Sequence, residues 1–128
     1  MRLSRLPALA AFAVLAGCGS SSSPSTPSPS PSDNPNKMTI SAAGVLTPNQ
    51  ITVSPGSRVL FINNHSHTHQ VTSDPHPEHT DCPEINQVGL LASGQSRETG
   101  NLNTVRTCGL HDHDDPDNAA LKGHIIIR

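Results

Sequence analysis

Short runs of apolar and β-favouring residues, separated by polar segments rich in Gly and Pro, extend from position 38 to the end of the chain. Alternation of apolar and polar residues is typical of strands, and no segment of ten residues shows the helical period. We expect turns and strands, in chain order, at Met38–Ser41, Ile51–Val53, Ser54–Ser57 (turn), Arg58–Ile62, Gln70–Thr72, Ala92–Gln95 (turn), Ser96–Thr99, Asn103–Cys108 and Gly123–Arg128. Many short strands joined by turns predict an all-β domain, either a sandwich or a barrel.

The first 17 residues follow a different pattern. Two arginines precede a short apolar run, Leu6–Ala16, which is too short to span a bilayer comfortably as a permanent helix. The run ends in Leu15-Ala-Gly-Cys18, which resembles the lipobox of bacterial lipoproteins. We therefore expect a signal peptide at residues 1–17 and a lipid anchor at Cys18, on the extracytoplasmic side of a bacterial membrane. The alternative is an ordinary signal peptide with a chance cysteine.

Residues 18–37 are almost entirely Ser, Pro, Thr and Asn, which predicts a disordered tether that cannot bury apolar surface. Residues 38–128 are long enough for one small domain. This domain carries nine acidic and five basic side chains, and its net charge of −4 argues against nucleic acid as a partner. We expect the membrane to be contacted through the lipid anchor alone.

Five of the eight histidines lie between positions 65 and 82. Alternate residues of a strand face the same side, so His65, His67 and His69 could share one face, and His65 or His67 could contact a metal. His76 and His79 lie in a segment stiffened by two prolines. That segment is either a solvated loop or part of a second, weaker metal site completed by Asp81 or by the acidic segment Asp112–Asp117.

The spacing Cys108-Gly-Leu-His111 brings a thiol and an imidazole together on one tight loop. A thiolate with two imidazoles suits copper that cycles between Cu(I) and Cu(II), because the soft sulfur stabilises Cu(I). His113 follows closely and competes with His111 for the role of ligand. The sequence therefore predicts a copper site that includes this segment.

The chain resembles a known family, the cupredoxins, which include plastocyanin and azurin. The resemblance covers essentially all of residues 38–128, and the order of its short motifs carries it: Gly44–Pro48, Ile51–Gly56, Val59–Asn64, His69–Thr72, Leu91–Ser96, Cys108–His111 and Leu121–Ile127. It implies a Greek-key β-sandwich with copper near one end and one-electron transfer as the usual work. Carried over by position, it implies His69, Cys108 and His111 as copper ligands.

The chain departs from the family pattern at three places. Leu121, which cannot coordinate, stands where a weak axial Met is expected, so an axial donor could be a backbone carbonyl, Glu84 or another histidine. The segment between His111 and Leu121 is long and acidic. The Tyr usual before the ligand cysteine is absent, and Val105 and Arg106 stand there.

Cys82 leaves two alternatives open. In an oxidising compartment two cysteines usually form one disulfide, and a Cys82–Cys108 bond would leave an imidazole-only copper site. We expect instead that Cys108 is the thiolate ligand, because its spacing to His111 fits that role. Cys82 resembles, in its distance from His69, a structural cysteine of the phytocyanin branch, but the partner cysteine of that branch is missing.

The expected function is one-electron transfer by a lipid-anchored copper protein, with a redox partner such as a cytochrome c. The alternative is a protein that binds, buffers or delivers copper through its additional histidines, with a copper-handling protein as partner. A small copper enzyme is a third hypothesis, and we do not expect an enzyme. The Gly-x-Ser-x-Gly motif of hydrolases and the Cys-x-x-Cys-His motif of haem attachment are both absent from the sequence.

Overall fold

The structure, a computed structural model, describes residues 33–128. The expected signal peptide, the expected lipid anchor at Cys18 and most of the expected tether lie outside the described residues. Within residues 33–128 the regular elements are nine strands and two short 3₁₀ turns, η2 (Ile85–Gln87) and η3 (Ala119–Leu121). In this part of the chain no helix is long and apolar enough to cross a membrane.

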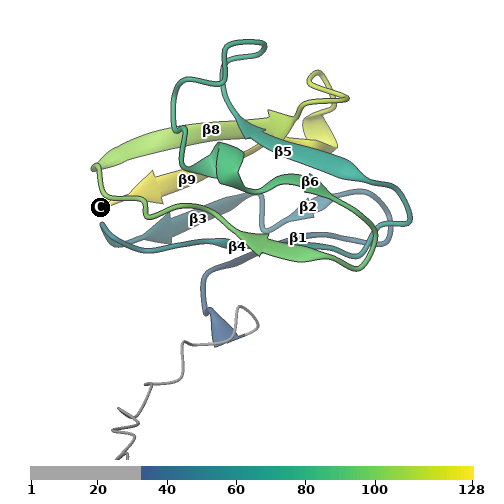
Figure 1. Cartoon of the computed structure of the whole chain (residues 1–128), viewed down its shortest axis with the longest axis horizontal. Helices are drawn as coiled ribbons and strands as arrows, with labels where there is room; N and C mark the ends of the chain where they lie inside the picture. The colour runs from purple at the N-terminus through teal and green to yellow at the C-terminus, as the bar shows by residue number, and fades with distance from the viewer. Residues whose placement is uncertain (1–32) are drawn as a thin grey trace, which may run out of the picture.

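The strands form two sheets that face each other (Figure 1). The four-stranded sheet has the order β2 (Leu46–Thr47), β1 (Lys37–Ile40), β4 (Leu60–Asn63), β7 (Ser96–Glu98). The five-stranded sheet has the order β3 (Gln50–Val53), β9 (Gly123–Ile127), β8 (Arg106–Asp112), β5 (His69–Ser73), β6 (Gly89–Leu91). The pairs β1–β4 and β3–β9 are parallel, and the remaining pairs are antiparallel. The prediction of an all-β sandwich is confirmed.

Alternate apolar residues of both sheets point into a core between them. Phe61 of β4 is fully buried there, and the rest of the core is aliphatic apart from the two cysteines: Met38, Ile40, Leu46, Val53, Val59, Val71, Ile85, Val88, Leu91, Leu102, Leu110, Leu121, Ile125 and Ile127. Both predicted turns are present, with Gly56 and Gly94 at positive φ. These features explain why the β pattern could be read from the sequence.

The strand β8 differs from its prediction in a way that changes the site. It was expected to end at Cys108, but it continues to Asp112 and pairs with β9 and β5. Cys108 and Leu110 belong to the core, so Asp112 lies on the same inner face, while Gly109 and His111 lie on the outer face. The segment expected to be a ligand loop is therefore a strand with two functional faces.

Cys82 and Cys108 form a disulfide, with Cα atoms 5.8 Å apart, and both are fully buried. This bond ties the segment after β5 to the middle of β8. A sulfur in a disulfide has no thiolate to offer a metal, so the prediction that Cys108 is a copper ligand is wrong. The Cys82–Cys108 bond, the alternative left open by the sequence, is present in the structure.

Candidate metal centre

Four histidines meet above the outer face of β8, and we call His76, His79, His111 and His113 the outer cluster. One ligand atom from each of His76, His79 and His111 lies within 4.8 Å of the others. His113 Nδ1 lies 2.9 Å from His79 Nε2. Nitrogens on one ion are about 3–4 Å apart when each is about 2.0 Å from the metal, so small ring rotations would bring these atoms onto one ion.

The outer cluster is assembled from two segments that are far apart in the sequence. His111 is the sixth residue of β8, and His113 follows the end of that strand. The loop after β5 folds back over this face and brings His76 and His79, and Figure 1 shows it rising above β5 and β8. The backbone N–H of Asp74 donates to Gly109 O at 3.0 Å, which fixes the start of the loop on β8.

The position of His79 is fixed by hydrogen bonds to the backbone. Its Nδ1–H donates to Ser73 O at 2.9 Å, its N–H donates to Pro75 O at 2.7 Å, and its carbonyl accepts from Asn86 Nδ2 at 2.8 Å. A carbonyl oxygen only accepts, so the proton is on Nδ1 and the lone pair is on Nε2. That lone pair points toward His113 and the rest of the cluster.

His111 is oriented by a carboxylate. Its Nδ1–H donates to Asp74 Oδ1 at 2.6 Å, and its Nε2 lies 3.3 Å from Thr72 Oγ1 on the paired strand. Gly109 makes this contact possible, because a Cβ there would overlap the carboxylate of Asp74. A carboxylate on the far nitrogen of a histidine is a common support for a metal ligand, since it fixes the tautomer and increases the basicity of the ring.

The four rings pack around one point. Ring centroids of His76 lie 5.4 Å from His79, 5.6 Å from His111 and 5.1 Å from His113. Those of His79 lie 5.1 Å from His111 and 4.9 Å from His113. His111 is buried whereas His76 is exposed, so the cluster is held from below and reached from solvent above.

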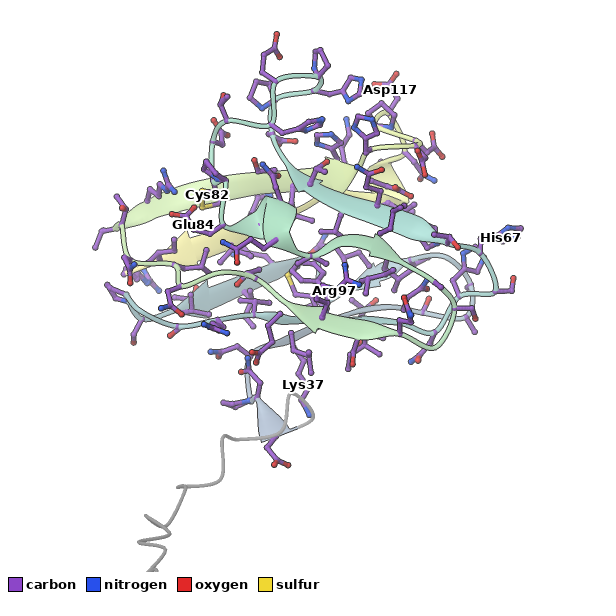
Figure 2. The ribbon with its side chains drawn as sticks, in the orientation of Figure 1. Lys37, His67, Cys82, Glu84, Arg97 and Asp117 are labelled. Carbon is purple, nitrogen blue, oxygen red and sulfur yellow. A yellow bond between two sulfur atoms is a disulfide. The ribbon has the colours of Figure 1, made fainter. Side chains whose placement is uncertain are left out.

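An open depression adjoins the outer cluster on its solvent side. His76 and His111 line it together with Asp74, Asp117 and Lys122. Figure 2 shows Asp117 at the top of the molecule, on the loop between β8 and β9 beside the loop that carries His76 and His79. A small ion can therefore reach these imidazoles without an opening of the core.

A second group of histidines lies where β4 leads into β5, and we call His65, His67 and His69 the inner group. His65 Nδ1 lies 2.7 Å from His69 Nε2, and the centroid of the His65 ring is 4.8 Å from that of His67. His69 Nδ1–H donates to Asp112 Oδ2 at 2.6 Å, and both of these residues are buried. Burial, followed by the neighbouring His69 and His67, lowers the pKa of His65, which favours its neutral form.

The predicted ligands are therefore divided between two places. His69 lies on the inner face with Asp112, whereas His111 lies on the outer face with Asp74, so these two histidines do not form one site with Cys108. Leu121, which stands where the family pattern has an axial Met, lines a cavity of about 10 Å³ that also touches His69, His111 and Asp112.

Glu84, one of the proposed axial donors, lies elsewhere. It forms an ion pair with Arg106 Nη2 at 2.8 Å. Figure 2 shows Glu84 beside Cys82, at the opposite end of the sandwich from His67. His76 and His79, the two histidines of the alternative second site, do lie together in the described residues. Their neighbours are His111 and His113 rather than Asp81 or the carboxylates of the segment Asp112–Asp117.

Comparison with solved structures places the domain among known folds. The chain matches the oxidized form of plastocyanin from Dryopteris crassirhizoma with 22% identity and a TM-score of 0.56, covering 72% of this chain and 99% of that one. The fold is cupredoxin-like. The purple cupredoxin from Nitrosopumilus maritimus matches this cupredoxin-like domain with 16% identity and a TM-score of 0.55, covering 73% and 99% of the two chains.

A mutant of amicyanin in its Cu(I) form also matches, with 15% identity, a TM-score of 0.55 and coverage of 75% and 84% of the two chains. No family model matches the sequence, and no curated protein matches it. These likenesses show the cupredoxin-like fold.

The sequence did not indicate the residues that orient the ligands. Asp74 and Asp112 each hold one imidazole, and the buried Asn63 holds the loop of the inner group through His65 N, at 2.9 Å, and His67 O, at 2.8 Å. The motif Asp74-Pro-His76 could have suggested a carboxylate beside a ligand. Asp112 can hold His69 only because β8 extends to residue 112. No local pattern in the sequence predicts that extension.

Proposed function

We propose that the chain is a copper-binding protein that works outside the cytoplasm and holds copper through the imidazoles of the outer cluster. One observation carries the proposal: His79 and His111 each donate an Nδ1–H to a fixed oxygen, which leaves both Nε2 atoms unprotonated. A metal would replace the present contacts of these two nitrogens with His113 and Thr72. His113 and the exposed His76 can supply further nitrogens. Such pre-oriented neutral imidazoles are typical metal ligands.

Copper is the metal favoured by donor chemistry and by fold. Imidazole suits Cu, Zn, Ni and Fe, and among divalent ions of this series Cu(II) binds a given nitrogen site most tightly. The similar amicyanin was solved in a Cu(I) form. When bound, copper would supply one-electron chemistry, and His79, His111 and His76 are the residues that would hold it.

The absence of a thiolate among the described residues separates this proposed site from a blue-copper site. The intense absorption of such sites near about 600 nm comes from charge transfer from a cysteine thiolate to Cu(II). Cys82 and Cys108 are joined to each other, so we expect only weak visible absorption from the copper-loaded domain.

Holding and handing over copper is the role we propose first. Of the four donors His111 is buried and His76 is exposed, and the depression beside them leaves room for a partner's ligand to approach. A copper-handling protein is the partner this role requires. Electron transfer to a redox partner such as a cytochrome c is the second candidate, and the fold shared with plastocyanin favours it. Both roles are non-enzymatic.

The proposed location rests on the disulfide and on the N-terminal sequence. Structural disulfides persist in oxidising compartments, so the Cys82–Cys108 bond supports a position outside the cytoplasm. We further propose lipidation at Cys18 and attachment to a bacterial membrane. Mass spectrometry of the chain from a lipoprotein-processing bacterium would test this: the native chain should carry the lipid and a Cys18→Ala chain should not.

Titration of the full chain with Cu(II), followed by elemental analysis, tests the proposed function. His79→Ala removes a central ligand, and the exposed His124→Ala removes a histidine of β9 outside both groups. We expect His79→Ala to lower the affinity for one of the bound copper ions by at least about tenfold. His124→Ala should leave that affinity unchanged. Equal copper binding by all three chains would refute the proposal for the outer cluster.

A further inference from the structure

The inner group has a geometry of its own, separate from the proposed copper site. Its members come from the segment between β4 and β5, and Figure 2 shows His67 at the end of the sandwich, away from the loop beside Asp117. None of the ring contacts among the described histidines joins the two groups. We propose that His65, His67 and His69 form a second binding site for a transition-metal ion, with Asp112 as the residue that positions His69.

The hydrogen bond from His69 to Asp112 leaves Nε2 as the unprotonated nitrogen of His69. Asp112 Oδ2 accepts from His69 Nδ1–H at 2.6 Å, so the lone pair of this neutral ring is on Nε2. The other oxygen of Asp112 accepts from Gln70 N at 3.0 Å and from Asp114 N at 3.3 Å. The carboxylate is therefore held in place by the backbone and fixes the imidazole in turn.

His65 is hydrogen-bonded to the unprotonated nitrogen of His69. Its Nδ1 lies 2.7 Å from His69 Nε2, and the two rings are stacked with centroids 5.0 Å apart. In the hydrogen-bonded pair a single proton lies between two nitrogens, and a metal would take its place after they separate to about 3–4 Å. His65 is only half buried, so its ring can make this small movement, while His69 stays fixed by Asp112.

The third imidazole is placed by the same loop. His67 is exposed, and its ring centroid lies 4.8 Å from that of His65. The buried side chain of Asn63 bonds to His65 N and His67 O, which holds both residues near His69. Gly44 lies close to the other side of the His65 ring, since a Cβ there would come 3.1 Å from His65 Cε1. Three imidazoles on one ordered loop suit a borderline ion such as Zn(II) or Cu(II).

Zn(II) titration of the full chain, followed by NMR of the histidine ring nitrogens and by elemental analysis, tests this second site. We expect two zinc equivalents for the native chain and shifted ring nitrogens of His65, His67 and His69 for one of them. His65→Ala should lower the zinc affinity of this second site by at least about tenfold, and Asp112→Asn should lower it by about 10- to 100-fold. Asp114→Asn, which removes an exposed carboxylate two residues away, is the matched control and should have no such effect.

The variants keep the two sites distinguishable. A chain carrying His79→Ala should still shift the inner rings with zinc, and a chain carrying His65→Ala should still bind zinc at the outer cluster. Unshifted rings at His65, His67 and His69 under saturating zinc, or unchanged zinc affinity after His65→Ala, would overturn the second site. If only the proposed outer site is wrong, His79→Ala should leave metal binding unchanged and His65→Ala should still reduce zinc binding.

Discussion

His111 and Asp112 are consecutive residues of β8, and their side chains lead to two different groups of histidines. His111 Nδ1 lies 2.6 Å from Asp74 Oδ1 on the outer face, and Asp112 Oδ2 lies 2.6 Å from His69 Nδ1 on the inner face. The pleat of the strand turns adjacent side chains to opposite sides, so one strand end supports both groups. In each pair a carboxylate fixes the tautomer of a histidine and leaves its other nitrogen unprotonated.

Asp74→Asn is expected to weaken copper binding at the outer cluster by about 10- to 100-fold, because the amide is a poorer acceptor for His111 Nδ1–H and makes the ring less basic. Asp117→Asn removes a carboxylate from the same depression without touching a histidine in the described contacts and serves as the control. Competition titration with a chromophoric chelator measures both affinities. Equal losses for the two variants would indicate a general charge effect and contradict the positioning role.

Gly109→Ala is expected to impair the same site through packing. A methyl group at this position would overlap the carboxylate of Asp74, so the carboxylate must leave His111. Copper affinity should fall with it, while the fold should persist because the overlap is with a side chain at the surface of the sheet. Thr107→Ala changes an exposed residue on the same outer face and should bind copper normally. Native affinity in the Gly109→Ala chain would rule out this role for the glycine.

Replacement of Cys82 and Cys108 together by Ala is expected to lower the free energy of unfolding by about 2–5 kcal/mol, since the disulfide closes a segment of 26 residues. The number of bound copper ions should not change in the folded protein, because neither sulfur is a ligand in this account. Urea denaturation and elemental analysis below the transition measure the two quantities. Loss of one copper equivalent from a fully folded variant would restore a ligand role for a cysteine.

Asn63→Ala is expected to destabilise the loop that carries the inner group. The buried amide donates to His67 O at 2.8 Å and to Leu91 O at 2.9 Å, and its oxygen accepts from His65 N. Its removal leaves buried backbone groups unpaired, at a cost of about 1–3 kcal/mol for each group that water cannot reach. The neighbouring exposed Asn64→Ala is the control. Matching unfolding curves for the two variants would show that the Asn63 contacts contribute little.

The sequence predicted the fold well and the site only in part, for a physical reason. Strand patterns and turns are local, so the positions of β3, β5, β7 and β9 could be read within a few residues. The end of β8 could not, because Gly109 interrupts the pattern and the pairing of Asp112 with Val71 is a contact across the sheet. Had β8 been known to reach Asp112, the alternation would have placed Cys108 in the core and His111 on the other face.

The outer cluster shows the same limit. His76 and His79 were recognised as candidate ligands for a second site, but the partners considered were Asp81 and the acidic segment. Their actual neighbours, His111 and His113, are reached only because the loop after β5 folds back over β8 and is held there by Asp74 N and Gly109 O. No spacing within the sequence encodes that return, which depends on the disulfide and the sheet together.

X-ray absorption at the copper edge of the full chain, carrying Cys18→Ala and loaded with one equivalent of copper, tests the central claim most directly. An imidazole-only site predicts nitrogen or oxygen neighbours at about 2.0 Å, the outer-shell scattering typical of histidine rings, and no sulfur near about 2.3 Å. A sulfur neighbour at that distance, with strong absorption near about 600 nm, would mean that the Cys82–Cys108 bond opens to ligate copper and would contradict the account.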